Sequence, residues 1–418
     1  MKEMRKIWIP LCVAVLTALL SCSDDDFTKT IFENESVQQD KNSYTYAFDA
    51  YLKATFRDPY NVDFIYRMQD IGSDMQKDLV PASYEQSVQL AVLSEYLWYD
   101  VYRKLAGEKD VFLKKYSPRI IHLIGSPGYN TDGTLTLGYA TNGTKITLQA
   151  VNWLDYRVIE GTRGLNYLFF HTMHHEFTHI LDQTISHPQA FNIISTGLYN
   201  SDWNNTPEEI ANSNGFVTAY ASANTTEDWA ETVSNYVTMN QDVWDNMMMV
   251  ADFDWESIDF RDNQQRDSIQ RLNNLTKTAP DFYNIDSIGY AFKQGSGEYK
   301  WVRKAIVRDA MTNAPVTDAN GNIQYLHNKT IKASDIITQK VELARLWLKD
   351  NYQIDIDELR KEVQTRQYLT NDDGDFIKVP DVNGNLQYVN RLAAPDPENP
   401  GQSFMETLLK TVDAFKDN

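Results

Sequence analysis

The stretch His171-Thr-Met-His-His-Glu-Phe-Thr-His-Ile-Leu181 holds four of the seven histidines in this 418-residue chain. Only one register of it gives the pattern His-Glu-x-x-His, and that register is His175-Glu176-Phe-Thr-His179. Four residues make about one helical turn, so the two imidazoles project from one face and can hold one metal ion. Glu176 lies just off that face, within reach of a water on the metal. We therefore expect a zinc site on a helix over about residues 165–185.

Zinc also needs a third protein ligand. A histidine six residues after His179 would supply one, but that position is Ile185. The remaining common solution is a carboxylate from a separate downstream helix. The segment Glu227-Asp-Trp-Ala-Glu231 follows 48 residues after His179, and its two glutamates lie one turn apart on the same face. One of them can ligate the metal while the other accepts the N–H of a ligand histidine. Asp228 is rotated by about 100° and should do neither.

Together these two motifs resemble the glutamate-zinc peptidases, the gluzincins, and are similar to the catalytic domain of anthrax lethal factor. The resemblance implies that Glu227 is the third zinc ligand and that Glu231 orients a ligand histidine. It also implies a tyrosine seven residues before the ligand glutamate, at Tyr220, as the donor to the oxyanion. Glu176 would take a proton from the attacking water and pass it to the leaving amine.

The first residues are typical of an export signal. Lys2, Arg5 and Lys6 precede an apolar run, residues 7–20, that is too short to span a bilayer. The run leads into Leu19-Leu-Ser-Cys22, which resembles a bacterial lipobox and implies that Cys22 is lipidated. Ser23-Asp-Asp-Asp26 resembles the acidic tag of surface lipoproteins. We therefore expect a protein anchored by lipid to the outer membrane and exposed at the cell surface.

The hydrophobic patterns predict an α+β, zincin-like fold, with a small mixed sheet packed on the active-site helix and a mainly helical part after it. Asn142-Gly143 predicts a turn between strands over 135–140 and 144–151. The second of these strands could align an extended peptide by strand addition, or it could be an ordinary internal strand. Ser334 is a candidate N-cap for a helix over 334–350, and the Asn-Gly segments 318–325 and 381–388 predict two similar hairpins.

These patterns divide the chain into four predicted parts. We predict a signal peptide (1–21), a flexible acidic tether (22–43), a metallopeptidase domain (44–366) and a C-terminal hairpin and helix extension (367–418). Removal of the signal changes the formal charge from −19 to −21, because three basic residues and one acidic residue leave. So acidic a chain is a poor candidate for binding nucleic acid. Of its two cysteines, Cys12 leaves with the signal and Cys22 would carry lipid, so no disulfide is expected.

The chain as a whole resembles a family of zinc metallopeptidase lipoproteins associated with TonB-dependent nutrient import. The shared features are the lipobox, Pro59-Tyr-Asn-Val62, the segment 174–181 and the segment 227–231. The resemblance implies a partner among SusC/SusD-type transporter complexes and contact with the membrane through the lipid anchor only.

These observations favour a zinc-dependent hydrolase, a peptidase acting on peptide or protein substrates at the cell surface in support of nutrient uptake. Two alternatives stay open. The same site could hydrolyse an amide in a substrate other than a protein, such as a peptidoglycan stem. The chain could also be a non-catalytic binding lipoprotein with a structural zinc, for which His171, one turn before His175, could supply a fourth ligand.

Overall fold

The computed structural model describes residues 41–68, 77–106, 109–130, 135–141, 144–276, 289–294, 297–326, 330–382 and 384–416. The predicted signal peptide, Cys22 and most of the predicted tether lie outside these residues, as does the Asn142-Gly143 turn. Within the described part of the chain, no helix is long and apolar enough to cross a membrane.

The largest sheet in the described part of the chain has four strands, in the order β1-β2-β6-β5. The first two pairs are parallel, and β5 runs antiparallel to β6. The strands are β1 (Asp63–Ile65), β2 (Ile120–Leu123), β5 (Gly138–Thr141) and β6 (Lys145–Leu148). The predicted strand over 144–151 is therefore internal, because β6 is paired on both sides. Strand addition along that segment is excluded, since both of its edges are already hydrogen-bonded.

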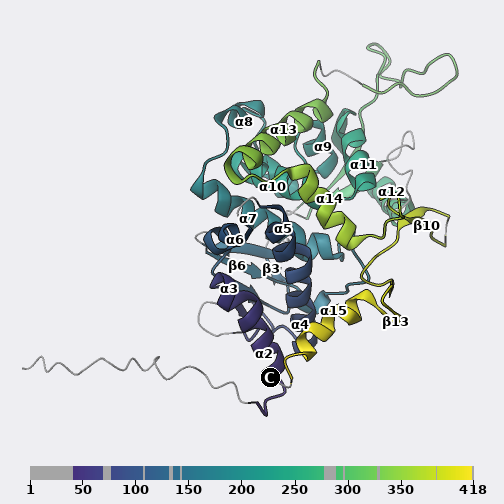
Figure 1. The fold of residues 1–418 in the computed structure, drawn as a ribbon. Coiled ribbons are helices and arrows are strands. Elements are labelled where there is room, and N and C mark those ends of the chain that lie inside the picture. The colour runs from purple at the N-terminus through teal and green to yellow at the C-terminus, as the bar shows by residue number, and fades with distance from the viewer. Residues whose placement is uncertain are drawn as a thin grey trace, which may run out of the picture.

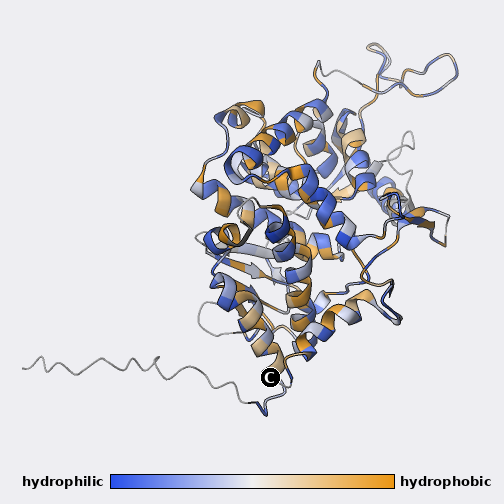
Figure 2. Ribbon diagram, viewed as in Figure 1, coloured by the Kyte–Doolittle hydropathy of each residue, from blue (hydrophilic) through white to orange (hydrophobic). Residues whose placement is uncertain are grey.

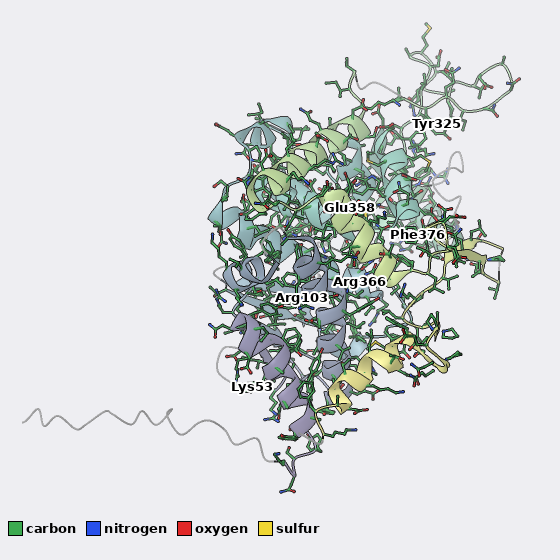
Figure 3. The ribbon with its side chains drawn as sticks, viewed as in Figure 1. Lys53, Arg103, Tyr325, Glu358, Arg366 and Phe376 are labelled. Atoms are coloured by element: carbon green, nitrogen blue, oxygen red, sulfur yellow. The ribbon has the colours of Figure 1, made fainter. Side chains whose placement is uncertain are left out.

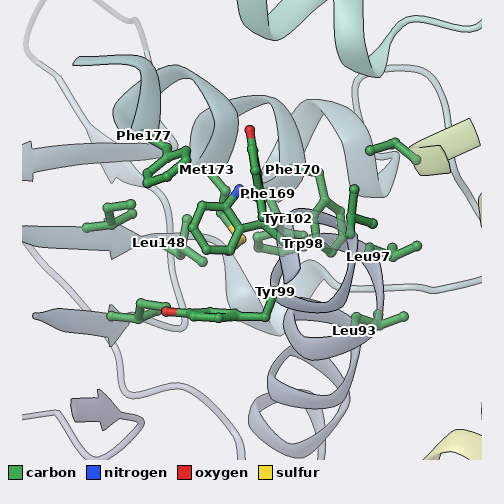
Figure 4. Packing of buried hydrophobic residues seen from close by; sticks show 14 of the residues in the cluster. Leu93, Leu97, Trp98, Tyr99, Tyr102, Leu148, Phe169, Phe170, Met173 and Phe177 are labelled. Atoms are coloured by element: carbon green, nitrogen blue, oxygen red, sulfur yellow. The ribbon is translucent and has the colours of Figure 1, made fainter. Parts of the chain in front are cut away.

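One long helix packs across this sheet. It begins with a wide π-type turn, η4 (Asn166–Phe170), and continues as α7 (His171–Thr184). Figure 4 shows Met173 and Phe177 of α7 directed into a cluster with Trp98 and Tyr102. The ring centroids of Trp98 and Phe177 lie 4.8 Å apart in an edge-to-face contact, and those of Tyr102 and Phe177 lie 4.9 Å apart. This aromatic face fixes the rotation of α7, so His171, His175 and His179 point the other way.

The helices before α7 share one hydrophobic core with the sheet, and α2 lies toward the end of the molecule opposite α13 (Figure 1). They are α2 (Tyr46–Leu52), η1 (Lys53–Arg57), α3 (Asp58–Tyr60), α4 (Tyr84–Ser94), η2 (Glu95–Tyr99), α5 (Asp100–Leu105) and α6 (Lys109–Tyr116). A small hairpin, β3 (Gly128–Tyr129) with β4 (Leu135–Thr136), and the turn η3 (Val151–Trp153) complete this half.

The second half is mainly helical and meets the first along α7 (Figure 1). Its helices are α8 (Gln189–Ile194), η5 (Trp203–Asn205), α9 (Glu208–Ser213), η6 (Tyr220–Ala223), α10 (Thr225–Thr238), α11 (Gln241–Ala251), α12 (Asn263–Thr276), α13 (Ala333–Tyr352) and α14 (Ile356–Gln367). The last helix, α15 (Phe404–Asp413), instead contacts α2 and α4 of the first half. Figure 2 shows hydrophobic and hydrophilic residues mixed along α13 and α14, as expected for helices with one buried face. Helix α13 begins at Ala333, so Ser334 lies inside the first turn and is not the N-cap.

Three short sheets accompany these helices. Strands β7 (Trp255–Asp259), β9 (Tyr299–Lys304) and β8 (Gly289–Lys293) form a sheet that the sequence patterns did not indicate. The pairs β10 (Lys378–Pro380) with β11 (Leu386–Tyr388) and β12 (Pro395–Asp396) with β13 (Asn399–Ser403) lie near the C-terminus. Asp318 and Asp381 each begin a tight turn that contains a glycine with positive φ, Gly321 or Gly384, and Figure 3 labels Tyr325 and Phe376 in these two projecting regions. The predicted hairpins are present.

The structure confirms the predicted α+β, zincin-like architecture, with a small mixed sheet on the active-site helix and a mainly helical second half. The C-terminal helix α15 returns to the first half, where Met405 and Val412 join the same hydrophobic core as Phe48 of α2.

Gly138 of β5 tests how closely the sheet must approach α7. A Cβ added there would lie 2.5 Å from Cγ2 of Thr172 and 2.8 Å from the carbonyl oxygen of Thr147. We expect Gly138→Ala to lower the free energy of unfolding by about 1–3 kcal/mol through overpacking, measured by urea denaturation. Gly401→Ala is the control, because no atom lies within 4 Å of the added Cβ. Equal stability of the two variants would contradict this account.

Candidate metal centre

The candidate site lies where α7 packs against α10. His171, His175 and His179 repeat every four residues and form one stripe along α7, on the face that meets α10. Helix α10 is capped by Asn224, whose side-chain oxygen accepts hydrogen bonds from the backbone N–H groups of Thr226 and Glu227. The cap places Glu227 in the first turn, beside the histidine stripe.

The structure brings together the three residues predicted to bind zinc. Nε2 of His175 lies 3.0 Å from Nε2 of His179 and 3.1 Å from Oε2 of Glu227. Nε2 of His179 lies 3.4 Å from the same oxygen of Glu227. A tetrahedral ion with bonds of 2.0–2.1 Å separates its donor atoms by about 3.3 Å, so this set has the spacing and the ligand types of a zinc site.

Glu231 lies behind the histidines, one turn after Glu227, and is buried. Its Oε1 lies 2.7 Å from Nδ1 of His175 and 2.9 Å from Nε2 of His171. Its Oε2 accepts hydrogen bonds from the Thr218 hydroxyl at 2.6 Å and from the Asn235 amide at 3.1 Å. This is the arrangement expected of a carboxylate that orients a ligand histidine. Sequence reasoning missed Thr218 and Asn235, although the spacing of four between Glu231 and Asn235 is visible.

The electrostatics of these residues favour a cation at this point. Burial would lower the pKa of His175, but hydrogen bonds with Glu227 and Glu231 raise it to about 10. Burial would likewise raise the pKa of Glu227, but His175 and His179 lower it to about 2. The pKa of Glu231 is also lowered, by His171 and His175, against the effect of its burial. Both glutamates are therefore carboxylates near neutral pH, and their negative charge stabilises a cation beside them, either a proton on His175 or a metal ion.

Tyr220 and Glu176, the two predicted catalytic residues, lie beside the same group. The ring of Tyr220 stacks on His175 with centroids 5.9 Å apart, and the Glu227 carboxylate lies close enough to raise the pKa of the tyrosine hydroxyl. Burial and the nearby carboxylates raise the pKa of Tyr220, so this hydroxyl keeps its proton. Glu176 is buried, and its negative charge acts on both His175 and Tyr220.

Two neighbouring residues do not belong to the candidate site. His174 points into the aromatic core, where its Nδ1 lies 2.9 Å from the Tyr102 hydroxyl, and burial lowers its pKa to about 3. Asp228 points away from the metal ligands, as expected, and is wholly buried in an ion pair with Lys340 of α13. Lys340 occupies an apolar position in the α13 stripe, between Ile337 and Val341, and sequence reasoning missed its role.

Two sets of three residues within the described part of the chain could hold a metal ion. The first contains His175, His179 and Glu227, and the second contains His171, His175 and Glu231. In the second set the Glu231 side chain is only 2% exposed, and both of its oxygens already accept hydrogen bonds. The first set is more open, with side-chain exposures of 15% for His179 and 20% for Glu227. A catalytic zinc needs an open position, which the first set allows.

Comparison with known proteins also indicates a zinc-binding protein. Residues 41–357 match the model of a family described as "Putative zinc-binding metallo-peptidase", and the chain belongs to this family. A crystal structure with the same description, from Bacteroides caccae, is similar to the chain at 29% sequence identity, with a TM-score of 0.51. The match covers 77% of this chain and 91% of that one. No curated protein matches the chain.

Asp228 provides a test that separates structural from metal-binding roles. On the sequence alone, Asp228→Ala should be nearly silent, because Asp228 does not face the metal. The buried ion pair corrects this expectation, since the variant would leave the Lys340 ammonium buried without its carboxylate. We expect the free energy of unfolding of the metal-free protein to fall by about 3–5 kcal/mol. Glu227→Ala, measured in the same way, should cost much less, because Glu227 is partly exposed.

Proposed function

We propose that this protein is a gluzincin-type zinc peptidase in which His175, His179 and Glu227 hold the metal. The observation that carries the proposal is the convergence of Nε2 of His175, Nε2 of His179 and Oε2 of Glu227 within 3.0–3.4 Å of one another. Membership in a family described as zinc-binding metallopeptidases supports both the metal and the reaction class.

Each remaining residue of the site has a task in peptide hydrolysis. A zinc ion bound here would polarise the substrate carbonyl and make a water molecule more acidic. Glu176 accepts the proton of the attacking water and returns it to the leaving amine. Tyr220 donates its hydroxyl proton in a hydrogen bond to the oxygen that becomes negative, which its raised pKa permits. Glu231 keeps the N–H of His175 on Nδ1 and so leaves Nε2 free to ligate.

The geometry favours this proposal over a structural zinc in a non-catalytic binding protein. A structural zinc has four protein ligands, and His171 was the candidate for the fourth. Nε2 of His171 instead contacts Glu231 and Asn235, on the far side of His175 from Glu227. An amidase acting on non-protein substrates would use the same residues, so only a substrate comparison separates it from a peptidase.

Glu176→Gln tests catalysis separately from metal binding. We expect the purified wild-type fragment after residue 43 to contain about one zinc per chain and to cleave a peptide library in a chelator-sensitive way. The Glu176→Gln variant should keep its zinc but lose turnover, because the base is not a ligand. His175→Ala and His179→Ala should lose both, with zinc measured by atomic emission. Wild-type hydrolysis by Glu176→Gln would refute the mechanism.

The wild-type fragment should be assayed in parallel on the peptide library and on peptidoglycan-stem amides. Cleavage of stem amides alone would favour the amidase. Zinc bound without cleavage of any substrate would favour the binding protein.

The two glutamates of α10 should differ in their effect on zinc affinity. We expect Glu227→Ala to remove most of the affinity, and Glu231→Ala to weaken it by roughly 10–100-fold, as the loss of a partner that orients a ligand does. Competition with a fluorescent chelator measures both. If Glu227→Ala kept its zinc while Glu231→Ala lost it, the ion would belong to the other set of residues.

We further propose that the peptidase acts at the bacterial surface, anchored through Cys22, in support of import through a TonB-dependent transporter complex. The support is the lipobox and acidic tag in the sequence. We expect Cys22→Ala to release the protein from the membrane fraction or to stall its processing, as followed by immunoblotting of fractionated cells. Ser21→Ala is the matched control, because a small residue before the cysteine is kept. Unchanged membrane association of Cys22→Ala would refute the proposed lipid anchor.

A further inference from the structure

Lys340 is a wholly buried charge that the proposed mechanism does not use. It comes from the middle of α13, and its ammonium lies 2.7 and 2.9 Å from the two carboxylate oxygens of Asp228 and 2.8 Å from the carbonyl oxygen of Gly215. Each of its three N–H groups therefore has an acceptor. The Phe216 ring centroid lies 4.3 Å from the same nitrogen, and the Tyr199 hydroxyl donates to Asp228 at 3.1 Å.

Such a pair adds little net stability compared with well-packed apolar residues, because two charges must be removed from water. The pair instead fixes geometry, because the acceptors of the Lys340 ammonium belong to two segments that carry site residues. Asp228 directly follows the proposed ligand Glu227. Gly215 begins the segment 215–221, which ends at the turn containing Tyr220.

The segment 215–221 is constrained along its whole length. Gly215 has φ of +84°, and a Cβ there would lie 2.5 Å from Cγ2 of Ile336 on α13. The Asn212 amide donates to the carbonyl oxygens of Phe216 and Val217 at 3.0 and 3.1 Å. Thr218 donates to Glu231 and accepts from the backbone N–H of Ala221 at 3.0 Å. The segment is thus tied to α10 at two points, through Lys340 to Asp228 and directly from Thr218 to Glu231.

We propose that Lys340 is a positioning residue that fixes the segment carrying Tyr220 against the ligand helix α10. Its ammonium bridges the carbonyl of Gly215 and the carboxylate of Asp228 and so sets where the Tyr220 hydroxyl lies relative to Glu227. The catalytic part of this inference rests on the proposed peptidase function, whereas its structural part does not.

The test uses the double variant Lys340→Met/Asp228→Asn, which removes both charges and keeps the shape of both side chains. We expect kcat to fall by at least about tenfold at unchanged zinc content. In a Tyr220→Phe background the same double change should alter kcat by less than about twofold, because it acts through Tyr220. A purely structural role would lower kcat equally in both backgrounds, and this result would overturn the proposal.

Hydrogen–deuterium exchange of the metal-free protein gives a readout that does not depend on activity. Residues 215–223 should exchange faster in the double variant, while α7 stays protected. Unchanged exchange in this segment would overturn the proposal, even if wild-type protein cleaves no peptide and the proposed function fails. If the double variant does not fold, Asp228→Glu keeps both charges of the buried pair, moves the carboxylate by one methylene and allows the same comparisons with smaller effects.

Arg366→Met is the matched control for the loss of a mostly buried cation. Arg366, labelled in Figure 3, pairs with Asp100 and Glu362 at 2.7 and 2.9 Å, and these partners belong to α5 and α14 rather than to the segment 215–221. We expect normal kcat and normal exchange over residues 215–223 in this variant. If Arg366→Met reproduced the effects of the double variant, they would reflect general loosening of the fold, and the proposal would fail.

Discussion

Both ring nitrogens of His175 need a partner on α10 at the same time. This requirement sets how α7 packs on α10. Nδ1 lies 2.7 Å from Glu231, and Nε2 lies 3.1 Å from Glu227. A neutral imidazole has one N–H and one lone pair, so the contact with Glu231 fixes the proton on Nδ1 and leaves Nε2 as a ligand. Because the two glutamates are one turn apart on the same helix, the distance and rotation of α10 relative to α7 are both fixed. The aromatic contacts of Phe177 hold α7 from the other side.

This arrangement places several carboxylates close together in a region of low polarity, which is unfavourable unless cations compensate them. The fold supplies one such cation for Asp228, in the form of Lys340. For Glu227 and Glu231 the compensation falls to the imidazoles, and this is why the pKa of His175 is raised to about 10. A divalent metal would replace that proton and satisfy the same carboxylates. Metal binding and folding are therefore coupled, since only the folded chain assembles the ligands.

Sequence reasoning could identify the parts of the site that lie within one helical turn of each other. The spacing of His175 and His179, and of Glu227 and Glu231, follows from the period of the α-helix, and both pairs lie as expected. Contacts that depend on tertiary packing were not accessible in this way. Lys340 lies 112 residues from Asp228, and although its place in the apolar stripe of α13 is visible, nothing in the sequence identifies Asp228 as its partner. The internal position of β6 depended on β2, which comes from an earlier part of the chain.

The part of the chain beyond the family match also supports the site. The match ends at residue 357, near the start of α14, but α14 packs against α10 and also reaches η4, the turn before α7. Gln364 donates to the carbonyl oxygen of Met239, just after α10, at 2.8 Å. Gln367 donates to Asn166 at 2.6 Å, and Asn166 in turn donates to the carbonyl oxygen of Thr238 at 2.9 Å. These groups are buried, so without α14 they would lose their partners. The α7–α10 pair is thus held in place at one end by Lys340 of α13 and at the other by the hydrogen bonds of α14. The geometry of the candidate metal centre depends on both.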